Sequence, residues 1–510
     1  MSENMLIREG MEWPPTTLLR HKMAEHSAWY SGDPNLLSTF YAQVVGSQVL
    51  NLPYTTERDM FWRRQIRNDV ELGLHIPIAS DIASNSADIL FSEAPMIKIT
   101  EAHEKNAQQS MKDTQEELNN MLDRSGFYQR ILAAAEVSAA IGGVYIKLAW
   151  DEELSPYPIP VVEQADNAYP VFRFGILTKV QFVKTVKAEK QGSAIFRLVE
   201  TYANNGTIMY ELYKGTSDKL GNSVPVTTID ETKDIVNLDI GIKEILCVFV
   251  PNVLPNRYDR TSYFGRSDYA SLEGLMDCLD ETYSSWMMDI AFARGKILVP
   301  EEFIEKTQSG FKFNIDKSVY VKLDMDPTIE GNKITAVQFD IRADKFEKTA
   351  LNLLERIVTG AGYSPQSFGL NIQGRAESGT ALNIRERKTF ATKNKKEAYW
   401  EGALKKLTQL MLIVYNTRLG GKVEMNVTVT TQFSDSISND IGELSEAVMK
   451  IANAMAASTE TKVRLIHPEW SEDEVLAEVK KIIDENGLMP EMDPDKLGVD
   501  EGDGNFGGDK

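Results

Sequence analysis

The stretch of this sequence that is closest in pattern to a chemical site is Gly374–Ala381, GRAESGTA. Two glycines flank four residues there, which is the spacing of the phosphate-binding loop of NTPases, G-x-x-x-x-G-K-[ST]. Thr380 takes the place of the lysine, and Ala381 takes that of the hydroxyl residue. Without the lysine, backbone amides alone do not neutralise the β- and γ-phosphates of a nucleotide. The sequence therefore predicts neither binding nor hydrolysis of ATP at this loop.

The segment before this loop, SFGLNIQ, is too short and too bounded by glycine to be the central strand that a phosphate-binding loop follows. A different reading fits better. Ser378 or Thr380 would cap a helix by accepting hydrogen bonds from its first amides, and Gly379 would allow a tight entry. The glycine loop is thus predicted to be the start of a helix.

The histidines do not complete a catalytic or metal-binding set. His21 and His26 are five residues apart, unlike the histidines of H-E-x-x-H, and no cysteine or carboxylate set accompanies them. His75, His103 and His467 are isolated, so no Ser-His-Asp or Cys-His arrangement can be argued. We expect no catalytic residue, no metal site and no cofactor, and hence no enzyme.

One enzymatic alternative stays open, a metal-dependent nuclease that would use some of the many carboxylates. The acidic pairs Asp151/Glu152 and Glu301/Glu302 fall in predicted loops or at strand ends and have no recognisable spacing. Metal-stimulated cleavage of DNA by the purified protein would favour this alternative.

Length and composition indicate a folded protein of several domains or an elongated subunit. The chain has 510 residues, of which 42% are hydrophobic and 25% are charged, as in ordinary soluble proteins. No apolar run approaches the roughly 20 residues of a membrane span, and no secretion signal is visible at the N-terminus, so no membrane is expected. Cys247 and Cys278 lie in apolar surroundings and are expected to be buried free thiols of a protein made inside a cell.

Charge is unevenly distributed along the chain. The net charge of −20 argues against a free-standing protein that binds DNA through a basic surface, although a channel that must not grip its DNA would be an exception. Between Arg375 and Lys422, eleven basic residues are opposed by only four glutamates. From Asp435 onward the chain is strongly acidic, and residues 489–510 are expected to form a flexible tail.

Hydrophobic periodicity predicts an α+β protein that is mainly helical. Helices dominate up to about residue 130, and short alternating strands follow up to about residue 255. Two helices, Ser267–Arg294 and Ala343–Thr359, then bracket a small strand-rich insert, which suggests an antiparallel pair with a β module at its tip. Further helices are predicted at Thr380–Leu419, Ile441–Ala456 and Ser471–Asn486.

The glycine loop and the helix after it have a recognisable pattern. AESGTALNIRERKTFATKNKKEAYWEGALKKL resembles the segment by which portal proteins of tailed bacteriophages are recognised, a Ser-Gly-x-Ala-Leu helix start followed by a long basic helix. LHIPIASDIASNSADILF and AIGGVYIKLAW also look like wing segments of the siphophage type of portal. Portal subunits have a wing, a stem of two helices with an inserted β-rich clip, a tunnel loop, a long wing helix and a helical crown. The predicted elements follow this order along nearly the whole chain.

The resemblance implies a division of the chain into the parts of a portal subunit. These are the N-terminal region and wing (1–265), stem helix 1 (266–294), the clip (295–342), stem helix 2 (343–359), the tunnel loop (360–379), the long helix and wing strand (380–435), the crown (436–488) and the acidic tail (489–510).

The same resemblance implies a function without chemistry. Portals form rings, commonly of twelve subunits, at one vertex of the capsid, and double-stranded DNA passes through the ring during packaging and ejection without being read for sequence. The implied partners are further copies of the chain, the terminase large subunit, head-completion or adaptor proteins, and the major capsid and scaffolding proteins. The implied location is the virion, and the host cytoplasm during assembly, where the portal nucleates the shell. Another ring-forming capsid or adaptor protein is the nearest alternative.

Candidate DNA-facing residues follow from this division. In the tunnel loop they are Tyr363, Gln366, Phe368, Asn371, Gln373 and Arg375. On stem helix 1 the carboxylates that could line or rim the channel and repel phosphates are Asp268, Glu273, Asp277 and Asp280, unless this face is simply a solvated surface. On stem helix 2 the cationic candidates are Lys345, Lys348 and Arg356, unless they pair with the neighbouring acidic helix.

The long helix is expected to serve packing. Its basic residues are predicted to form salt bridges with acidic neighbours in preference to contacts with DNA. Its apolar positions look like core, namely Tyr399, Trp400, Leu404, Leu407 and Leu410.

Overall fold

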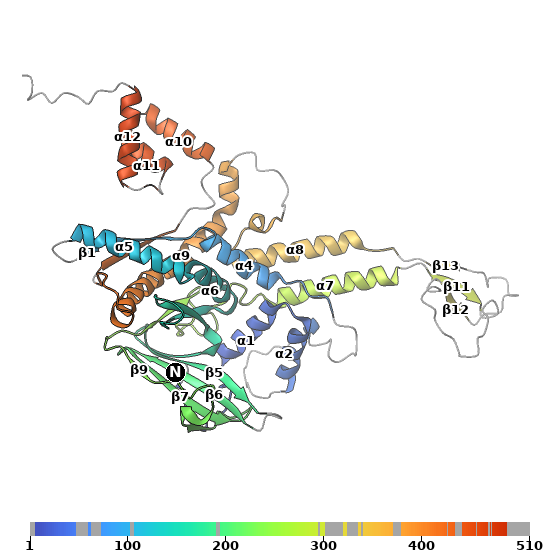
Figure 1. Ribbon diagram of the computed structural model, residues 1–510. Coiled ribbons are helices and arrows are strands. Elements are labelled where there is room, and N and C mark those ends of the chain that lie inside the picture. Colours follow the sequence, from blue (N-terminus) through green and yellow to red (C-terminus); the bar gives the residue numbers. More distant parts are fainter. Residues whose placement is uncertain are drawn as a thin grey trace, which may run out of the picture. The chain divides into compact units, whose positions relative to one another are not determined.

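The computed structural model divides the chain into two units, which are described separately (Figure 1). The larger unit comprises residues 1–375 and 384–434, and the smaller one residues 376–383 and 435–510. The structure describes residues 6–46, 60–62, 73–102, 107–189, 194–293, 296–300, 320–323, 335–337, 340–370, 379–425, 427–433, 441–454, 456–467, 470 and 472–486.

Three helices form the centre of the larger unit, α1 (Leu18–Ser31), α4 (Ile78–Phe91) and α6 (Phe127–Ile141). α6 packs against both α1 and α4. It is rich in alanine, which favours helix and lets neighbouring helices approach closely. Two more helices of this unit are α2 (Pro34–Gly46) and α5 (Ala107–Arg124).

α6 ends at Gly142, whose φ of +100° is a left-handed conformation that glycine adopts without strain. A Cβ atom on Gly142 would lie 2.7 Å from the carbonyl oxygen of Gly265. A Cβ atom on Gly265 would lie 2.3 Å from the carbonyl oxygen of Gly142. The two backbones therefore touch, and this contact places the loop that leads into α7 directly against the end of α6.

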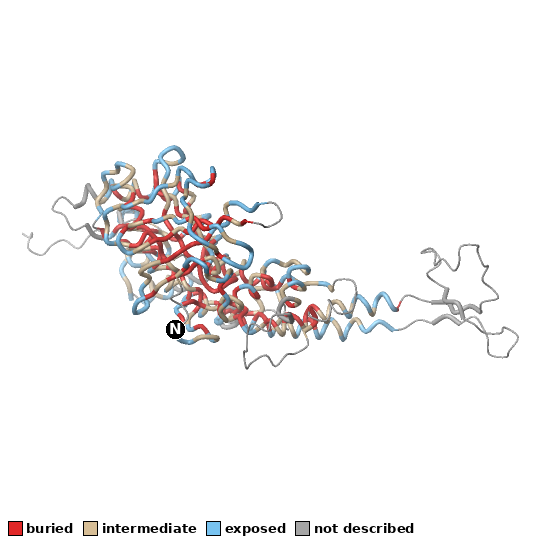
Figure 2. Tube along the Cα trace, turned by 90° about the horizontal axis from the view of Figure 1, so that it is seen from below, coloured by how far each residue is buried: buried red, intermediate tan, exposed pale blue. Residues whose placement is uncertain are grey.

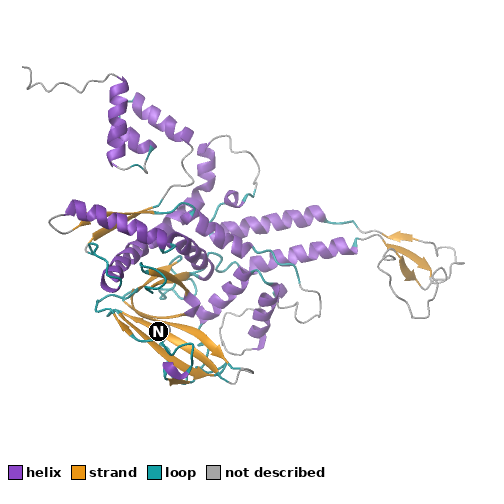
Figure 3. Cartoon of the chain, viewed as in Figure 1, coloured by secondary structure: helices purple, strands orange, loops and turns teal. Residues whose placement is uncertain are grey.

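Two antiparallel sheets account for most of the strands (Figure 3). The smaller has the order β10-β2-β3, formed by Cys247–Pro251, Gly143–Ala149 and Ile159–Gln164. The larger has the order β4-β5-β6-β7-β8, formed by Ala168–Arg173, Ile176–Ala188, Ile195–Ala203, Thr207–Gly215 and Asn222–Val224, with β9 (Leu238–Asp239) paired to β7. A turn at residues 204–206 joins β6 to β7. β1 (Met96–Ala102) pairs with β14 (Val427–Gln432), and two short 3-10 turns lie at Ala165–Asn167 and Val226–Thr228.

A helical hairpin projects from this body, formed by α7 (Glu273–Phe292) and α8 (Ala343–Ala361). The helices are antiparallel, because Asp289 near the end of α7 pairs with Arg342 just before α8. Trp286 and Phe346 stack between them with ring centroids 6.2 Å apart. Figure 2 shows the hairpin changing from buried to exposed along its length. The helix pair expected from the sequence is thus confirmed.

A small sheet is inserted between α7 and α8, as predicted (Figure 1). Its order is β12-β11-β13, formed by Tyr320–Leu323, Lys296–Pro300 and Thr335–Val337. β11 runs parallel to β12 and antiparallel to β13. The assignment of the hairpin and this sheet as stem and clip stays a prediction.

α9 (Gly379–Arg418) is a helix of 40 residues, close to the predicted bounds. At about 1.5 Å per residue it is about 60 Å long. Of its five predicted core side chains, Tyr399 is partly buried against the core. The other four are buried in it, namely Trp400, Leu404, Leu407 and Leu410. Such a length is stable in one helix only because other elements cover it.

The smaller unit contains α10 (Ile441–Asn453), α11 (Thr459–Ile466) and α12 (Glu472–Asn486). The first and last were predicted, whereas α11 was not, because its eight residues carry too short a pattern. Ser458 caps α11 by accepting a hydrogen bond from the amide of Thr461. In the part of the chain that the structure describes, no helix combines the length and the hydropathy that a membrane span requires.

Candidate functional site

The hairpin root is the buried place where α7 begins, α8 ends and α9 passes. We define it by Asp268, which precedes α7, by Glu273, Asp277 and Asp280 of α7, and by Lys396 of α9. The carboxylates were predicted to line or rim a channel. This expectation is wrong, because all four side chains are buried within the subunit, with exposed fractions of 8%, 8%, 0% and 0% for Asp268, Glu273, Asp277 and Asp280.

Asp268 joins the hairpin to the long helix. Its carboxylate accepts hydrogen bonds from Lys396 Nζ at 2.6 Å, from the Tyr363 hydroxyl at 2.7 Å and from Asn252 Nδ2 at 2.7 Å. Lys396 also donates to Ser86 Oγ of α4 at 2.6 Å. Burial lowers the pKa of Lys396, and the negative charge of Asp268 opposes that shift. A buried ion pair of this kind requires every partner in place, so it fixes α9 and α4 against the start of α7.

Glu273 joins the hairpin to α1. It contacts His26 Nε2 at 3.0 Å and accepts a hydrogen bond from the Tyr258 hydroxyl at 3.1 Å. Burial opposes the charge of Glu273, but the hydrogen bond and charge of His26, helped by Lys22, outweigh it and lower the pKa of Glu273 to about 2. The carboxylate is therefore held ionised inside the protein.

Asp277 and Asp280 bind a part of the chain far away in sequence. Asp277 accepts hydrogen bonds from the backbone amides of Phe61 and Trp62 at 2.9 and 3.3 Å. Asp280 accepts from Trp62 Nε1 and from the backbone amide of Ile76, each at 2.8 Å, and it contacts the ring of His75. Burial raises the pKa of Asp280, and the contact with His75 partly offsets this. These two carboxylates thus act as hydrogen-bond acceptors for backbone amides within residues 60–62 and 73–76.

The cationic candidates of α8 differ from the carboxylates of α7. Lys345, Lys348 and Arg356 are exposed, and they lie on the side of α8 opposite to the buried Ala350 and Ile357. None of the three forms an ion pair with a carboxylate of the described residues. The alternative expectation, that they pair with the neighbouring acidic helix, is therefore not met within the subunit.

The first part of the predicted tunnel loop is folded against the body. Gly362 ends α8 with a φ of +104°, and a 3-10 turn, η6 (Pro365–Phe368), follows. Tyr363 was predicted to face the channel, but it is buried because its hydroxyl donates to Asp268. Phe368 packs against it with ring centroids 6.0 Å apart, and Gln366 is half-buried.

Two serines attach this part of the loop to α9. The Ser364 amide donates to Thr389 Oγ1 at 2.9 Å, and the Ser367 hydroxyl donates to Glu386 at 2.5 Å. Asn371, Gln373 and Arg375 lie outside the described residues, as does most of the glycine loop at residues 374–381.

Salt bridges account for several of the basic residues of α9, as predicted. Lys405 and Lys406 pair with Glu401 and Glu244 at 2.6 and 2.5 Å, and the buried Lys393 lies 3.5 Å from Glu397. Reasoning from the sequence missed the role of Lys396 and of His26. The signal for Lys396 was its spacing, because it lies four residues before Trp400 on the apolar stripe of the helix.

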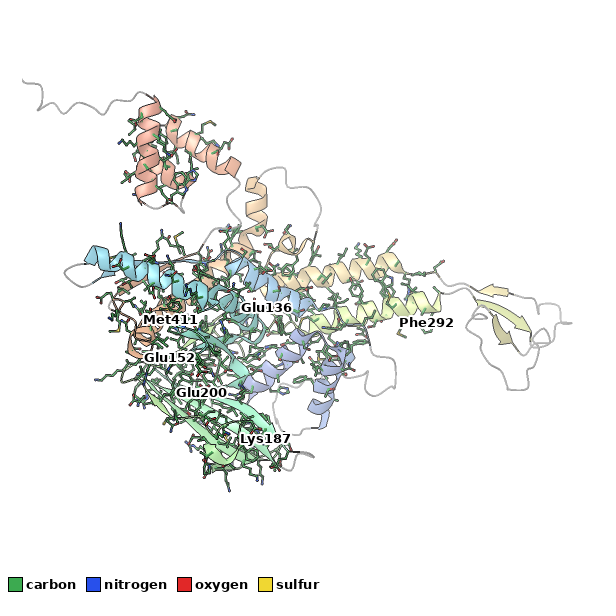
Figure 4. The ribbon with its side chains drawn as sticks, in the orientation of Figure 1. Glu136, Glu152, Lys187, Glu200, Phe292 and Met411 are labelled. Atoms are coloured by element: carbon green, nitrogen blue, oxygen red, sulfur yellow. The ribbon has the colours of Figure 1, made fainter. Side chains whose placement is uncertain are left out.

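The far half of α7 carries exposed apolar side chains, which we call the α7 apolar strip. It consists of Met287, Met288, Ile290 and Phe292, of which Met288 and Phe292 are 50% and 58% exposed. Figure 4 marks Phe292 near the far end of α7. Among the described residues, no group of histidine, cysteine, aspartate and glutamate is arranged to hold a metal ion. The ionisable groups of the hairpin root form hydrogen bonds and ion pairs between elements of the subunit. The site is therefore a structural one, from which the helical hairpin projects.

Comparison with solved structures finds low similarity over most of the chain. The virion of a native gene transfer agent (GTA) particle contains a chain with 10% identity and a TM-score of 0.42, covering 90% of this chain and 96% of that one. The neck of an empty GTA particle, computed with C6 symmetry, gives 12% identity, a TM-score of 0.43 and coverage of 76% and 90%. The neck of a native GTA particle, computed with C12 symmetry, gives 11%, 0.42, 77% and 89%.

No curated protein matches the chain. The family comparison is decisive instead. The family described as "Phage portal protein, SPP1 Gp6-like" matches residues 24–487 of this chain. These residues include the hairpin root, the helical hairpin, its inserted sheet and α9. This chain therefore belongs to the SPP1 Gp6-like family of phage portal proteins.

Proposed function

We propose that copies of this chain form a closed ring at one vertex of a phage capsid, and that double-stranded DNA passes through the ring during packaging and ejection. The observation that carries this proposal is the family match over residues 24–487. The protein acts as a structural channel and not as an enzyme. Neither a nuclease nor a different adaptor protein is favoured by a specific observation.

The α7 apolar strip supports assembly into a ring. Exposed apolar surface of this kind commonly marks a contact with another protein. In a ring each subunit uses two different surfaces, one toward each neighbour, so the strip of one copy would pack against a different face of the next. We propose a ring of twelve subunits, in which the hairpin is the stem and the inserted sheet is the clip.

The outer face of α8 supports contact with DNA. Lys345, Lys348 and Arg356 are exposed and have no described ion-pair partner, and in a ring each would be repeated by symmetry. Contacts between such cations and phosphates carry no sequence information, as a channel for a whole genome requires. We further propose that Gln366, Asn371, Gln373 and Arg375 of the tunnel loop approach the DNA. Among these, Arg375 is the candidate for touching phosphate.

The remaining proposals concern partners and location. The ring would be found in the virion and, during assembly, in the host cytoplasm. It would bind the terminase large subunit during packaging and head-completion or adaptor proteins afterwards, and with the major capsid and scaffolding proteins it would nucleate the shell.

Electron microscopy of the purified full chain tests this function. We expect rings with a central channel, and native mass measurement should give one closed oligomer across a range of protein and salt concentrations. Monomers or dimers under all these conditions would contradict the proposal. Metal-stimulated cleavage of DNA by the same preparation would favour a nuclease.

A further inference from the structure

The first part of α9 carries more positive charge than the subunit neutralises. Five basic residues and no acidic residue occupy positions 387–396. Two of them, Lys393 and Lys396, are buried and lie 3.5 Å and 2.6 Å from carboxylates. The other three are exposed, namely Arg387, Lys388 and Lys395. Among the described residues no carboxylate pairs with any of these three, since the ion pairs of α9 are formed by other lysines.

The exposed side of α9 carries small side chains beside these cations. Ala391, Asn394 and Ala398 are exposed, and their spacing from Arg387 and Lys395 by three or four residues places them on the same side of the helix. We call this side the α9 cationic face. Protein partners are bound mainly through large apolar and aromatic side chains. Phosphate backbones are bound through arginine, lysine and asparagine, so the composition of this face favours a phosphate backbone.

Lys388 joins the α9 cationic face to the exposed cations of α8. Its ammonium donates a hydrogen bond to the carbonyl oxygen of Thr359, in the last turn of α8. Thr359 is exposed and lies three residues after Arg356, on the side of α8 that also carries Lys345 and Lys348. The exposed cations of the two helices therefore adjoin each other at Lys388.

This grouping of cations contrasts with the charge of the whole chain. The net charge is −20, and acidic residues outnumber basic ones by 75 to 55. Cations that are gathered on one surface and lack a carboxylate partner within the described residues create a local positive potential, which attracts a polyanion. On α8 alone, the stretch from Lys345 to Thr359 is about 20 Å long at a rise of 1.5 Å per residue, so it is long enough to face several phosphates of a duplex.

On the basis of the proposed function, in which DNA passes through a ring of these chains, we propose that Arg387 and Lys395 of the α9 cationic face bind phosphates of double-stranded DNA. The DNA-binding surface then continues from α8 onto α9. Lys388 has a positioning role, because its bond to Thr359 holds the two helices together at this point. Contacts of this kind act on any base sequence, since phosphates carry no sequence information.

Binding of a DNA duplex to the full chain tests the proposal. The probe is a fluorescein-labelled duplex of mixed sequence, and its anisotropy is measured against protein concentration at several salt concentrations. Arg387→Gln combined with Lys395→Gln should weaken binding at low salt by at least about tenfold. The slope of log K against log salt concentration should also become shallower, by about 0.9 for each phosphate contact that is lost.

A matched double variant controls for the change in net charge. Arg173→Gln combined with Lys184→Gln removes the same two charges from exposed positions of β4 and β5. This variant should bind the duplex with the affinity and the salt dependence of the unmodified protein. An equal loss of affinity in both double variants would overturn the proposal, because the effect would then come from net charge and not from the α9 cationic face.

Native mass measurement of the same preparations separates this proposal from the proposed function. Unmodified rings that bind no duplex at low salt, or rings of the α9 variant with an unchanged salt slope, would overturn the α9 site while the ring itself stands. Unmodified protein that forms no ring would contradict the proposed function and the α9 site with it.

Two other uses of the α9 cationic face are outcomes of the same experiments. A fluorescein-labelled polyglutamate peptide should bind unmodified rings more weakly than the duplex does. Binding of this peptide as tight as that of the duplex, and lost in the α9 variant, would overturn the proposal in favour of an acidic protein segment. A change of oligomeric state caused by the α9 variant would also overturn it, because the face would then contact a neighbouring copy.

Discussion

Lys396 and Asp268 form a buried ion pair, and such a pair is costly unless each partner is satisfied. Here Tyr363, Asn252 and Ser86 supply the remaining hydrogen bonds. The pair therefore acts as a specific connection between elements that are distant in sequence. Removing the ion pair should therefore destabilise the packing of the whole hairpin root.

Replacing Lys396 with methionine should destabilise the protein by about 3–5 kcal/mol, because Asp268 is then left as an unpaired buried charge. Unfolding by urea measures this loss. The double variant Asp268→Asn with Lys396→Met should recover part of it, since no buried charge remains. Lys405→Met provides the control, because exposed pairs such as Lys405–Glu401 contribute about 0–1 kcal/mol. Equal losses at both lysines would show that the buried pair has no special role.

Glu273 makes the stability dependent on pH in the acidic range. Its pKa is lowered in the folded state, from 4.5 to about 2. The stabilisation of the folded state by ionised Glu273 is therefore complete above pH 4.5. It declines as the pH falls from 4.5 toward about 2 and is lost below that pH. A shift of this size corresponds to a difference on the order of 3 kcal/mol. Glu273→Gln should be less stable than the unmodified protein near neutral pH, and the difference should vanish on acidification. A pH-independent difference between the two unfolding curves would contradict this.

At the scale of elements, the two helices of the hairpin carry different exposed side chains. α7 is held at its base by buried carboxylates and carries apolar residues further along. α8 is amphipathic, with an apolar face toward α7 and an exposed face that carries Lys345, Lys348 and Arg356. Under the proposed function, contact with a neighbouring copy is therefore assigned to α7 and contact with DNA to α8.

Reversing the charge of Lys345, Lys348 and Arg356 together should leave folding and ring formation intact, because all three are exposed and unpaired among the described residues. DNA packaging or retention should fall, since carboxylates would repel the phosphates that the cations attract. The measurement is the amount of nuclease-protected DNA in assembled particles. Lys184→Glu, at an exposed site on β5, is the control and should package normally. Normal packaging by the triple variant would remove these residues from the channel.

The order and bounds of the main helices could be predicted from the sequence, because long apolar periodicities such as that of α7 survive in any tertiary context. The rotation of α7 could not. Asp277 and Asp280 have the composition of a solvated face, and only the fold brings Trp62 and His75 to them. The same limit applied to Tyr363, whose partner Asp268 lies 95 residues away. A buried carboxylate is recognisable only when its donors are known.

At the scale of the whole molecule, the α7 apolar strip makes a prediction about assembly. Met287→Glu combined with Met288→Glu should convert the proposed ring to smaller species, because charge would be placed on the apolar surface that we propose to be buried between copies. Native mass measurement would detect the change. Leu154→Glu, at a residue that is 77% exposed elsewhere on the larger unit, should leave the ring unchanged. A ring that tolerates the α7 change would place the subunit contact on another surface.

Gly142 and Gly265 touch through their backbones, at the point where the chain enters the hairpin. Neither position has room for even a methyl group, so natural variation at both should be narrow although neither belongs to a proposed binding surface. A library of random substitutions, selected only for infectious particles, should return glycine at these two positions nearly without exception. The lack of tolerated substitutions at Gly142 and Gly265 would then reflect the packing of the backbone. A position could thus be invariant without contacting DNA or any partner.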